Sequence, residues 1–459
     1  MVIKIPQQVN RAIEILRQNG HTAYVVGGAV RDAIMGKSAN DWDIATSARP
    51  EETAAAFADF RVIETGIKHG TVTVILDGES LEITTYRIES GYSDSRHPDK
   101  VEFTDMIEDD LSRRDFTVNA IAFSPFAGIA DPFGGCDDIN AKIIRCVGEA
   151  DRRFGEDALR ILRALRFSAT LGFEIDKDTS ESIRKNYKSL ERISSERIHT
   201  EISKLLCGID AKRILLDYSD VFFFIFPALK PMKGCAQNHE RHVYDVWGHT
   251  VEAVANVAPE PHLRLAMLFH DSGKPFVKTT DEKGIDHFYN HSKKSREIAF
   301  DAMTMLKVSN KLRDKVCNLV EYHDFLPEKI SKKTYKKYTG ILGFDTVEEL
   351  FEIRKADVSA QNPKFLDECL EANEIGLKIL EDIREENSCL KISDLAINGK
   401  DLENADIPPS PEMRRILETL LDEVLEEKTE NSKNALLKRV EDIKKQMNCE
   451  RRRYGNSKN

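Results

Sequence analysis

The chain has 459 residues, enough for two to four domains, and its 41% hydrophobic content is that of an ordinary globular protein. A formal net charge of −11 counts against a dedicated nucleic-acid binder, which is usually basic, and no apolar run reaches the roughly 18 residues that a membrane span needs. Eight scattered cysteines without a C-x-x-C pair, and an N-terminus without a signal-peptide pattern, predict reduced thiols and a cytoplasmic location.

Residues 1–150 mix predicted strands and helices. The segments "TAYVVGG", "GTVTVIL" and "LEITTYRI" are rich in β-branched residues and bounded by glycine or charge, which is typical of strands. From residue 151 onward apolar residues recur at helical spacing, and the prolines and glycine of 226–238 mark a boundary. This order predicts an α+β chain, with a mixed-sheet domain followed by all-α regions, and with domains at 1–150, 151–235, 236–375 and 376–459.

The first predicted strand ends in Gly27-Gly28, and "GGAVRDAIM" then opens a helix. Glycine lets a ligand approach the backbone, and the first amides of a helix attract anions, so this turn suits a phosphate; a simple tight turn is the alternative. Arg31 adds a positive charge in the first helical turn. Asp41 and Asp43 follow in "DWDIA", and in an extended segment their carboxylates point to one side, where both can bind Mg²⁺. Glu82, on a predicted strand, is a candidate third carboxylate.

Two further motifs carry possible nucleotide contacts. "DLSRRDFTVNAIA" at 110–122 places two arginines where guanidinium groups can bind phosphate or ribose oxygens. "FGEDALRILRALRF" is predicted to begin a helix at residue 154, with Asp157 and Arg160 as neighbours on one face. An aspartate accepts a hydrogen bond from an exocyclic amine, and an arginine donates to ring nitrogens and carbonyls, so this pair would favour cytosine and adenine over uracil. The alternative is a surface ion pair worth about 0.2–0.5 kcal/mol.

Taken together, "GGAVRD…DWDIA…RRDFTVNA…DPFGG…EDALRILRALRF…ERIHTEISKLL" resembles the class II tRNA nucleotidyltransferase and bacterial poly(A) polymerase family over roughly residues 20–235. The resemblance implies a polymerase-β-like nucleotidyltransferase head, then helical neck, body and tail, and two-metal nucleotidyl transfer. It implies that Asp41 and Asp43, with Glu82 as the candidate third carboxylate, hold Mg²⁺. The implied nucleotide-binding residues are Gly28, Arg31, Arg114, Asp157, Arg160, Arg163 and Arg166. Whether Arg113 or Arg114 faces the nucleotide stays open.

The polar segment "RIESGYSDSRHPDKVEF" at 87–103 resembles the flexible loop with which CCA-adding enzymes switch from C to A. Its presence and the acidic composition favour C-C-A addition, from CTP and ATP, to tRNA lacking a complete CCA end. Addition of a single A, or of a poly(A) tail, remains the nearest alternative. A nucleotide hydrolase whose head only binds nucleotide, and a non-catalytic tRNA-binding module, are the other classes, and the presence of both Asp41 and Asp43 argues against the hydrolase.

Histidines and aspartates recur in "HVYDVWGHT", "LAMLFHDSGKP", "HFYNHSKKS", "VEYHDF" and "RKADVSAQN", with a His-Asp doublet at 270–271 predicted on a helix. Imidazole and carboxylate ligands suit Mn²⁺, Fe²⁺, Ni²⁺, Co²⁺ or Mg²⁺. The block resembles the HD phosphohydrolase superfamily, with its pattern H…HD…D, which implies attack of a metal-activated water on a phosphoester. The implied metal ligands are His249, His270, Asp271 and Asp357, with His291, His323 and Lys274 for a second metal or the substrate phosphate. In related tRNA nucleotidyltransferases such a domain is linked to phosphatase or 2′,3′-cyclic phosphodiesterase activity.

Overall fold

The structure is a computed structural model that describes residues 3–39, 41–63, 66, 70–92, 99–324, 331–386 and 388–455. The chain divides into two compact units. The first contains residues 1–230 with the short segments 259–264 and 302–308, and the second contains 231–258, 265–301 and 309–459. The predicted boundary at 235 falls next to this division, whereas the boundaries at 150 and 375 fall inside the units. In the described part of the chain, no helix is both long and apolar enough to cross a membrane.

A seven-stranded mixed sheet forms the N-terminal part of the first unit, in the order β3-β4-β5-β2-β1-β8-β9. β2 and β5 pair in parallel, and the other neighbours are antiparallel. The strands are β1 (Ala23–Val26), β2 (Ile44–Thr46), β3 (Arg61–Ile63), β4 (Thr71–Leu76), β5 (Glu79–Thr85), β8 (Ala122–Ser124) and β9 (Gly128–Ala130). The predicted α+β class with a mixed sheet is confirmed, although the sequence did not predict the short β8–β9 hairpin.

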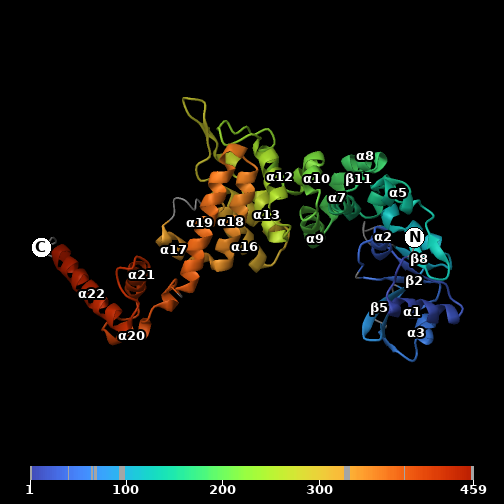
Figure 1. Cartoon of the computed structure of the whole chain (residues 1–459), viewed down its shortest axis with the longest axis horizontal. Coiled ribbons are helices and arrows are strands. Elements are labelled where there is room, and N and C mark those ends of the chain that lie inside the picture. The colour runs from blue at the N-terminus through green and yellow to red at the C-terminus, as the bar shows by residue number, and fades with distance from the viewer. Residues whose placement is uncertain are drawn as a thin grey trace. The chain divides into compact units, whose positions relative to one another are not determined.

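The sheet follows from the alternation of its residues. In β4, Val72, Val74 and Leu76 are buried while the intervening residues are half-exposed, as expected of a strand with one core face. The same part of the first unit contains the helices α1 (Gln7–Gln18), α2 (Gly28–Ile34), α3 (Pro50–Ala56), α4 (Ile107–Ser112) and α5 (Gly135–Ala141) (Figure 1). A separate hairpin pairs β6 (Arg87–Ser90) with β7 (Lys100–Phe103). It lies within the predicted C-to-A loop, of which residues 93–98 are outside the described residues.

The rest of the first unit is helical, as predicted from residue 151 onward. Its helices are α6 (Ala150–Glu156), α7 (Leu159–Leu171), α8 (Lys177–Asn186), α9 (Ser195–Leu206), α10 (Ala211–Asp217) and α11 (Ser219–Ile225), with β10 (Ile143–Ile144) parallel to β11 (Glu174–Ile175). The prediction of one helix beginning at residue 154 is wrong, because α6 ends at Glu156 and α7 begins at Leu159. Asp157 separates them in an extended conformation, and its Oδ1 accepts from the Leu159 amide at 3.0 Å. Short polar side chains favour such helix ends because they can bond free backbone amides.

The second unit is almost entirely helical. Its long helices are α12 (Val246–Asn256), α13 (Pro261–Phe269), α15 (His291–Met305), α16 (Asn310–Glu321), α17 (Lys332–Leu342), α18 (Phe344–Ser359), α19 (Leu366–Glu385), α21 (Pro411–Leu425) and α22 (Lys433–Gly455). The first four residues of α13 and the last four of α15 belong to the first unit. Shorter elements are α14 (Lys274–Val277), α20 (Gly399–Asn404) and the antiparallel pair of β12 (Thr279–Thr280) and β13 (Asp286–His287). Helices α20 to α22 share a core of their own, which includes Leu402, Leu420 and Leu436.

Candidate functional site

The predicted phosphate turn lies between β1 and α2. Gly27 adopts φ +78°, a conformation that side chains rarely take, and a Cβ there would lie 2.9 Å from Arg114 Nη1. Glycine is therefore required for the backbone conformation and for the close approach of this guanidinium. Gly28 is the first residue of α2, as predicted.

Three predicted carboxylates meet beside this turn. Ile44 pairs with Ile83 across the parallel strands β2 and β5, so Asp43 and Glu82, which precede them, come to the same end of the pairing. Burial raises the pKa of Asp43, Asp41 and Glu82 raise it further, and Arg114 lowers it. Mutual repulsion of this kind is relieved by a bound cation, so the residues present fit a Mg²⁺ site. The segment 41–43 precedes β2 and is not part of it.

The two adjacent arginines of "RRDFTVNA" have different surroundings. Arg113 donates to Asp110 Oδ1 at 2.8 Å and to Glu89 Oε1 at 3.1 Å. Arg114 lies against Gly27, reaches Asp110 only at 3.4 Å, and its buried Nε has no hydrogen-bond partner among the described residues. Of the two, Arg114 is thus the arginine beside the glycine turn and Asp43.

Three predicted nucleotide-binding arginines surround one aromatic ring. The guanidinium carbons of Arg31, Arg163 and Arg166 lie 5.2, 5.3 and 3.8 Å from the centroid of Phe167, which is buried in α7. Cations are attracted to an aromatic face, so the ring gathers side chains from α2 and α7. The sequence did not identify Phe167, which reads as one more apolar residue of a helix.

A polar chain joins two of these arginines. Arg31 donates from Nη1 to Asn119 Oδ1 at 2.6 Å, and Asn119 donates to Asp115 Oδ1 at 3.2 Å. Asp115 Oδ2 accepts from Arg163 Nε at 2.8 Å, and burial of Asp115, which would raise its pKa, is outweighed by Arg163, which lowers it. The chain connects α2 with α7 through the "RRDFTVNA" segment. Its charged groups are already paired, so Arg31 and Arg163 are held in position.

Asp157 and Arg160 are close in the sequence, but their side chains form ion pairs with different residues. Asp157 Oδ2 accepts from Arg197 Nη2 on α9 at 2.7 Å. Arg160 Nη1 donates to Glu156 Oε2 at 2.5 Å, and its Nη2 to the Arg113 carbonyl at 3.3 Å. The alternative interpretation, an ion pair between Asp157 and Arg160 on the surface of one helix, is not found among the ion pairs of the described residues, because the helix is interrupted at Asp157.

In the second unit, four predicted ligands converge from three segments. His249 lies in α12 and Asp357 in α18, whereas His270 and Asp271 follow the end of α13 at Phe269, so the prediction that the doublet lies on a helix is wrong. His249 Nε2 is 2.8 Å from Asp357 Oδ1 and 3.3 Å from His270 Nε2. Asp271 Oδ2 lies 3.4 Å from His249 Nε2 and 3.3 Å from His270 Nε2. These atoms surround one point, which we call the first cluster.

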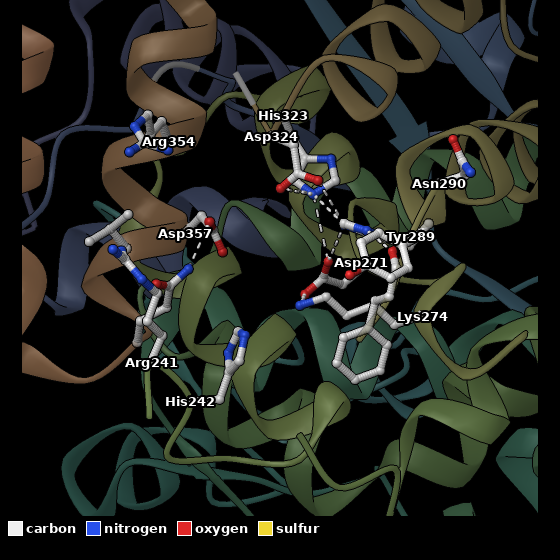
Figure 2. A pocket seen from close by; sticks show the side chains of 14 residues that line it. Arg241, His242, Asp271, Lys274, Tyr289, Asn290, His323, Asp324, Arg354 and Asp357 are labelled. Atoms are coloured by element: carbon white, nitrogen blue, oxygen red, sulfur yellow. Dashed lines mark hydrogen bonds and ion pairs between the residues drawn. The ribbon is translucent and has the colours of Figure 1, made fainter. Parts of the chain in front are cut away.

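The other oxygen of Asp271 belongs to a second cluster. Its Oδ1 lies 3.3 Å from His291 Nε2 and 3.6 Å from His323 Nε2, and these two nitrogens are 3.1 Å apart. Asp324 adds a carboxylate, with Oδ2 at 3.3 Å from His291 Nε2 (Figure 2). Asp324 was not predicted as a ligand, although "HD" at 323–324 repeats the doublet at 270–271. Asp271 therefore bridges two groups of donor atoms.

All four imidazoles are oriented in the same manner. Each Nδ1 lies within hydrogen-bonding distance of a backbone carbonyl: Ala360 for His249 at 3.2 Å, Met267 for His270 at 2.6 Å, Phe288 for His291 at 2.8 Å and Val320 for His323 at 2.7 Å. A carbonyl accepts only from N–H, so each Nδ1 carries a proton, and a neutral imidazole in this orientation presents its Nε2 lone pair to a cation. Facing lone pairs at 3.1–3.3 Å repel unless a cation lies between them.

The charges around the clusters also fit a cation. Burial lowers the pKa of His270, but Asp271 and Asp357 outweigh it and raise the pKa to about 10. Asp271 Oδ2 is buried, and it lies 2.7 Å from Lys274 Nζ and 3.3 Å from His270 Nε2, so groups that carry or can carry a positive charge already surround it. The donor set of imidazoles and carboxylates suits divalent transition metals or Mg²⁺.

Both clusters open into one cavity of about 470 Å³. Lys274 also donates to Gln237 Oε1 at 2.7 Å, which holds its ammonium at the wall. Figure 2 shows Arg241 and Arg354 beside Asp357, and Tyr289 and Asn290 on the opposite side of the metal-ligating residues. The cavity thus combines candidate metal ligands with three basic side chains, which suits an anionic ligand.

Comparison with known proteins places these sites in context. The model of the poly(A) polymerase head domain matches residues 23–145, the probable RNA- and SrmB-binding site of polymerase A matches 172–233, and the putative tRNA nucleotidyltransferase domain 2 matches 279–440. The CCA-adding enzyme of Ligilactobacillus salivarius is 47% identical over 223 residues, 48% of this chain and 55% of that protein. The CCA-adding enzyme of Geobacillus stearothermophilus is 48% identical over 46% of this chain and 51% of that protein. The matched region thus spans about half the length of these relatives.

Similarity of structure extends further along the chain. The crystal structure of the Bacillus stearothermophilus CCA-adding enzyme in complex with CTP matches 97% of this chain and 98% of its own, at 29% identity and a TM-score of 0.74. The Thermotoga maritima CCA-adding enzyme complexed with tRNA matches 95% of this chain and 94% of its own, at 20% identity and a TM-score of 0.56, and supports the fold alone.

Proposed function

We propose that this chain, which contains the head and RNA-binding domains of the poly(A) polymerase family and a tRNA nucleotidyltransferase domain, completes and repairs the 3′-terminal CCA of tRNA from CTP and ATP. The observation that carries the proposal is the meeting of Asp41, Asp43 and Glu82 with Arg114 at the Gly27 turn, in a chain built like a CTP-bound CCA-adding enzyme. We expect it to act in the cytoplasm on tRNA whose CCA end is incomplete.

In this proposal Asp41 and Asp43, with Glu82 as the third candidate, hold Mg²⁺. Divalent cations at such a site activate the attacking hydroxyl and neutralise the triphosphate. The RNA 3′-oxygen forms the new bond to the α-phosphorus, pyrophosphate leaves, and the hydroxyl proton passes to solvent. Arg114 and the backbone at Gly28 bind the triphosphate, because a guanidinium and helix-terminal amides both attract phosphate oxygens.

Base selection is assigned to Asp157 and Arg160, with Arg163 and Arg166 supporting them from α7, the helix that also carries Arg160. Both selecting side chains are held by neighbours in the free protein, Asp157 by Arg197 and Arg160 by Glu156. An incoming base must therefore exchange with these partners. Cytosine and adenine both offer an amine to Asp157, whereas uracil offers a carbonyl, which the carboxylate repels.

The test is incubation of the purified protein with tRNA lacking CCA, Mg²⁺ and each labelled NTP, separately and together, with products resolved at single-nucleotide length. Two additions with CTP alone and three with CTP plus ATP support CCA addition. One A added only to tRNA ending in CC would indicate an A-adding enzyme, and a long ladder with ATP a poly(A) polymerase. No addition in any mixture would refute nucleotidyl transfer.

We further propose that the second unit is a metal-dependent phosphohydrolase of the HD type, because Asp271 offers one oxygen to each of two ligand clusters above a basic cavity. His249, His270 and Asp357 complete the first cluster, and His291, His323 and Asp324 the second. Divalent cations there supply a nucleophilic water and charge neutralisation at phosphorus. Hydrolysis adds water across one P–O bond, and the leaving ribose oxygen takes a proton.

In this reaction Lys274 orients Asp271 and attracts the substrate phosphate to the cavity wall. The test offers 2′,3′-cyclic AMP, and a tRNA ending in a 2′,3′-cyclic phosphate, as substrates to metal-loaded protein and to its Asp271→Asn variant. Release of a monoester by the wild type alone supports the assignment. Equal inactivity of both proteins with Mn²⁺, Ni²⁺, Co²⁺, Fe²⁺ and Mg²⁺ would leave the clusters a structural role only.

A further inference from the structure

We propose that Tyr289 is a stacking platform for a nucleobase, so that the cavity of the second unit selects terminal nucleoside phosphates over other phosphoesters. The proposal rests on the proposed hydrolase site for its phosphate end and adds a base subsite. It is carried by an exposed aromatic ring that stacks on His287 at the cavity wall, next to the second cluster.

The position of Tyr289 is set by a tight turn. The backbone amide of His291 donates to the Phe288 carbonyl at 3.2 Å, and His291 Nδ1 lies 2.8 Å from the same oxygen. Tyr289 and Asn290 are the two residues inside this turn, and Asn290 adopts φ +60°, an uncommon conformation for a residue other than glycine. The turn that orients His291, a candidate metal ligand, thus also sets the backbone position of Tyr289.

The ring of Tyr289 is supported on one side. It stacks on His287 with ring centroids 5.5 Å apart and an angle of 6° between the planes. His287 Nε2 in turn lies 3.1 Å from Asp281 Oδ2, across the turn that joins β12 to β13. Tyr289 is nevertheless 71% exposed, a high value for a large aromatic residue. A ring that already stacks on a neighbouring side chain and still has exposed surface loses little conformational entropy when a flat ligand stacks on it.

The remaining wall explains which flat ligand fits. Tyr289 and Asn290 line the same cavity as Lys274, Asp271 and Asp324, so an aromatic face and an amide lie beside the proposed phosphate site. A volume of about 470 Å³ is within the range of roughly 300–1,000 Å³ of small-ligand sites. A base on the ring, its edge at Asn290 and its phosphate at the metal ligands is the arrangement of a nucleoside phosphate. A plain phosphate or a phosphosugar would leave the ring unused.

Binding tests the platform without requiring hydrolysis. In Mn²⁺-loaded full-length protein we would measure the Kd of adenosine 3′-monophosphate and of inorganic phosphate by calorimetry. Base stacking on an aromatic residue is worth about 1–3 kcal/mol, so Tyr289→Ala should weaken the nucleotide by roughly 5- to 150-fold relative to phosphate. Tyr289→Phe should retain the preference, because the ring remains. Nucleotide bound by the head is common to all variants and cancels in the comparison.

A matched control is Phe276→Ala, which removes another half-exposed aromatic ring of the second unit that does not line the cavity. It should leave the preference for nucleotide unchanged. An unchanged preference in Tyr289→Ala would overturn the base subsite even if the protein hydrolyses phosphoesters. Loss of the preference in a protein that hydrolyses nothing would uphold the subsite and refute only the hydrolase.

Hydrolysis then identifies the source of the nucleoside phosphate. We would measure kcat/KM for 2′,3′-cyclic AMP and for an RNA oligonucleotide that ends in a 2′,3′-cyclic phosphate. Each value is divided by kcat/KM for bis(p-nitrophenyl) phosphate. Both ratios should fall in Tyr289→Ala if the base subsite reads the terminal nucleoside. A larger fall for the oligonucleotide assigns the site to RNA ends, and a larger fall for cyclic AMP assigns it to free nucleotides. Two ratios equal to wild type would contradict the proposal.

Discussion

Asp271 is the residue whose replacement should disturb both ligand clusters at once. Its Oδ2 lies 3.3–3.4 Å from the imidazole nitrogens of the first cluster, and its Oδ1 lies 3.3–3.6 Å from those of the second. Asp271→Asn keeps the shape but replaces one oxygen by an amide nitrogen, which cannot bind a cation. Removing a partner that only orients a metal ligand costs roughly 10- to 100-fold in affinity, and loss of a ligand itself should cost more.

The expected stabilisation follows from the two sites. A metal at 100 times its Kd stabilises the folded state by about 2.7 kcal/mol per site. Two sites therefore contribute on the order of 5 kcal/mol, or about 10–20 °C in the melting temperature of a unit of this size. The wild type should show this rise when Mn²⁺ is added after EDTA treatment, and Asp271→Asn should not. Elemental analysis should count two ions per wild-type chain and fewer than one in the variant.

Two control variants make this prediction specific. Asp324→Asn should lose only the second ion, because Asp324 contacts His291 and His323 alone among the histidines of the clusters. Asp245→Asn should keep both, since Asp245 caps α12 by accepting from the Gly248 amide and does not line the cavity. If Asp271→Asn bound two ions with wild-type affinity, the bridging role of this carboxylate would be refuted.

Three further predictions concern the first unit. Asp43→Asn should abolish nucleotide addition and yet raise the melting temperature in EDTA at pH 7. The fold raises the pKa of Asp43, so its ionised form costs stability. The gain in melting temperature should vanish as the pH falls below 3.8, the ordinary pKa of an aspartate. An equal or lower melting temperature at pH 7 would contradict this. Arg160→Ala should raise UTP incorporation relative to CTP by about tenfold or more in single-nucleotide assays; unchanged selectivity would exclude a reading role. Asp115→Ala leaves Arg163 without its main partner, and since that guanidinium is partly exposed we expect a loss of about 2 kcal/mol, seen as a fall of roughly 4–8 °C in the melting temperature; a shift within 1 °C or so would show that the pair is dispensable.

Sequence reasoning identified side chains whose chemistry depends on local spacing. Gly27 and Asp43 lie near each other because a β-α turn and the following strand belong to one sheet, and the hydrophobic alternation that predicts the strands also fixes this geometry. The candidate ligands of the second unit were found for a different reason, since a histidine beside an aspartate is uncommon enough to notice. Asp324 repeats that same doublet, and it was missed only because His323 was read by itself.

Other features depend on partners that are far apart in the sequence. Asp157 was expected beside Arg160, but it ends one helix and pairs with Arg197, forty residues later. No periodicity of a single segment can show this, because the competing partner comes from another helix. The same is true of Phe167 in α7. Its contact with Arg31 comes from α2, a helix far away in the sequence. Tyr289 looked like an ordinary loop residue until its stacking on His287 was visible.

The candidate Mg²⁺ site of the head and the two clusters of the second unit should differ in how they bind metal. The side chains of Asp41 and Asp43 reach solvent, although surrounding protein partly desolvates Asp43, and a site of two or three carboxylates leaves most positions around Mg²⁺ to water and to substrate phosphates. His249, His270 and Asp271 are buried, and their donor atoms lie within 4.8 Å of one another before any ion binds. Such a preformed nitrogen-rich site favours transition metals over Mg²⁺.

This contrast makes the two activities separable by metal alone. EDTA-treated protein that receives only Mg²⁺ should regain nucleotide addition, while phosphoester hydrolysis should return only with Mn²⁺, Ni²⁺, Co²⁺ or Fe²⁺. Without nucleotide, Asp43→Asn should take up two equivalents of Mn²⁺ and Asp271→Asn fewer than one, as measured by electron paramagnetic resonance of free Mn²⁺. Uptake that instead required CTP and an intact Asp43 would show that the head holds the tighter site, against the reasoning from burial and donor type.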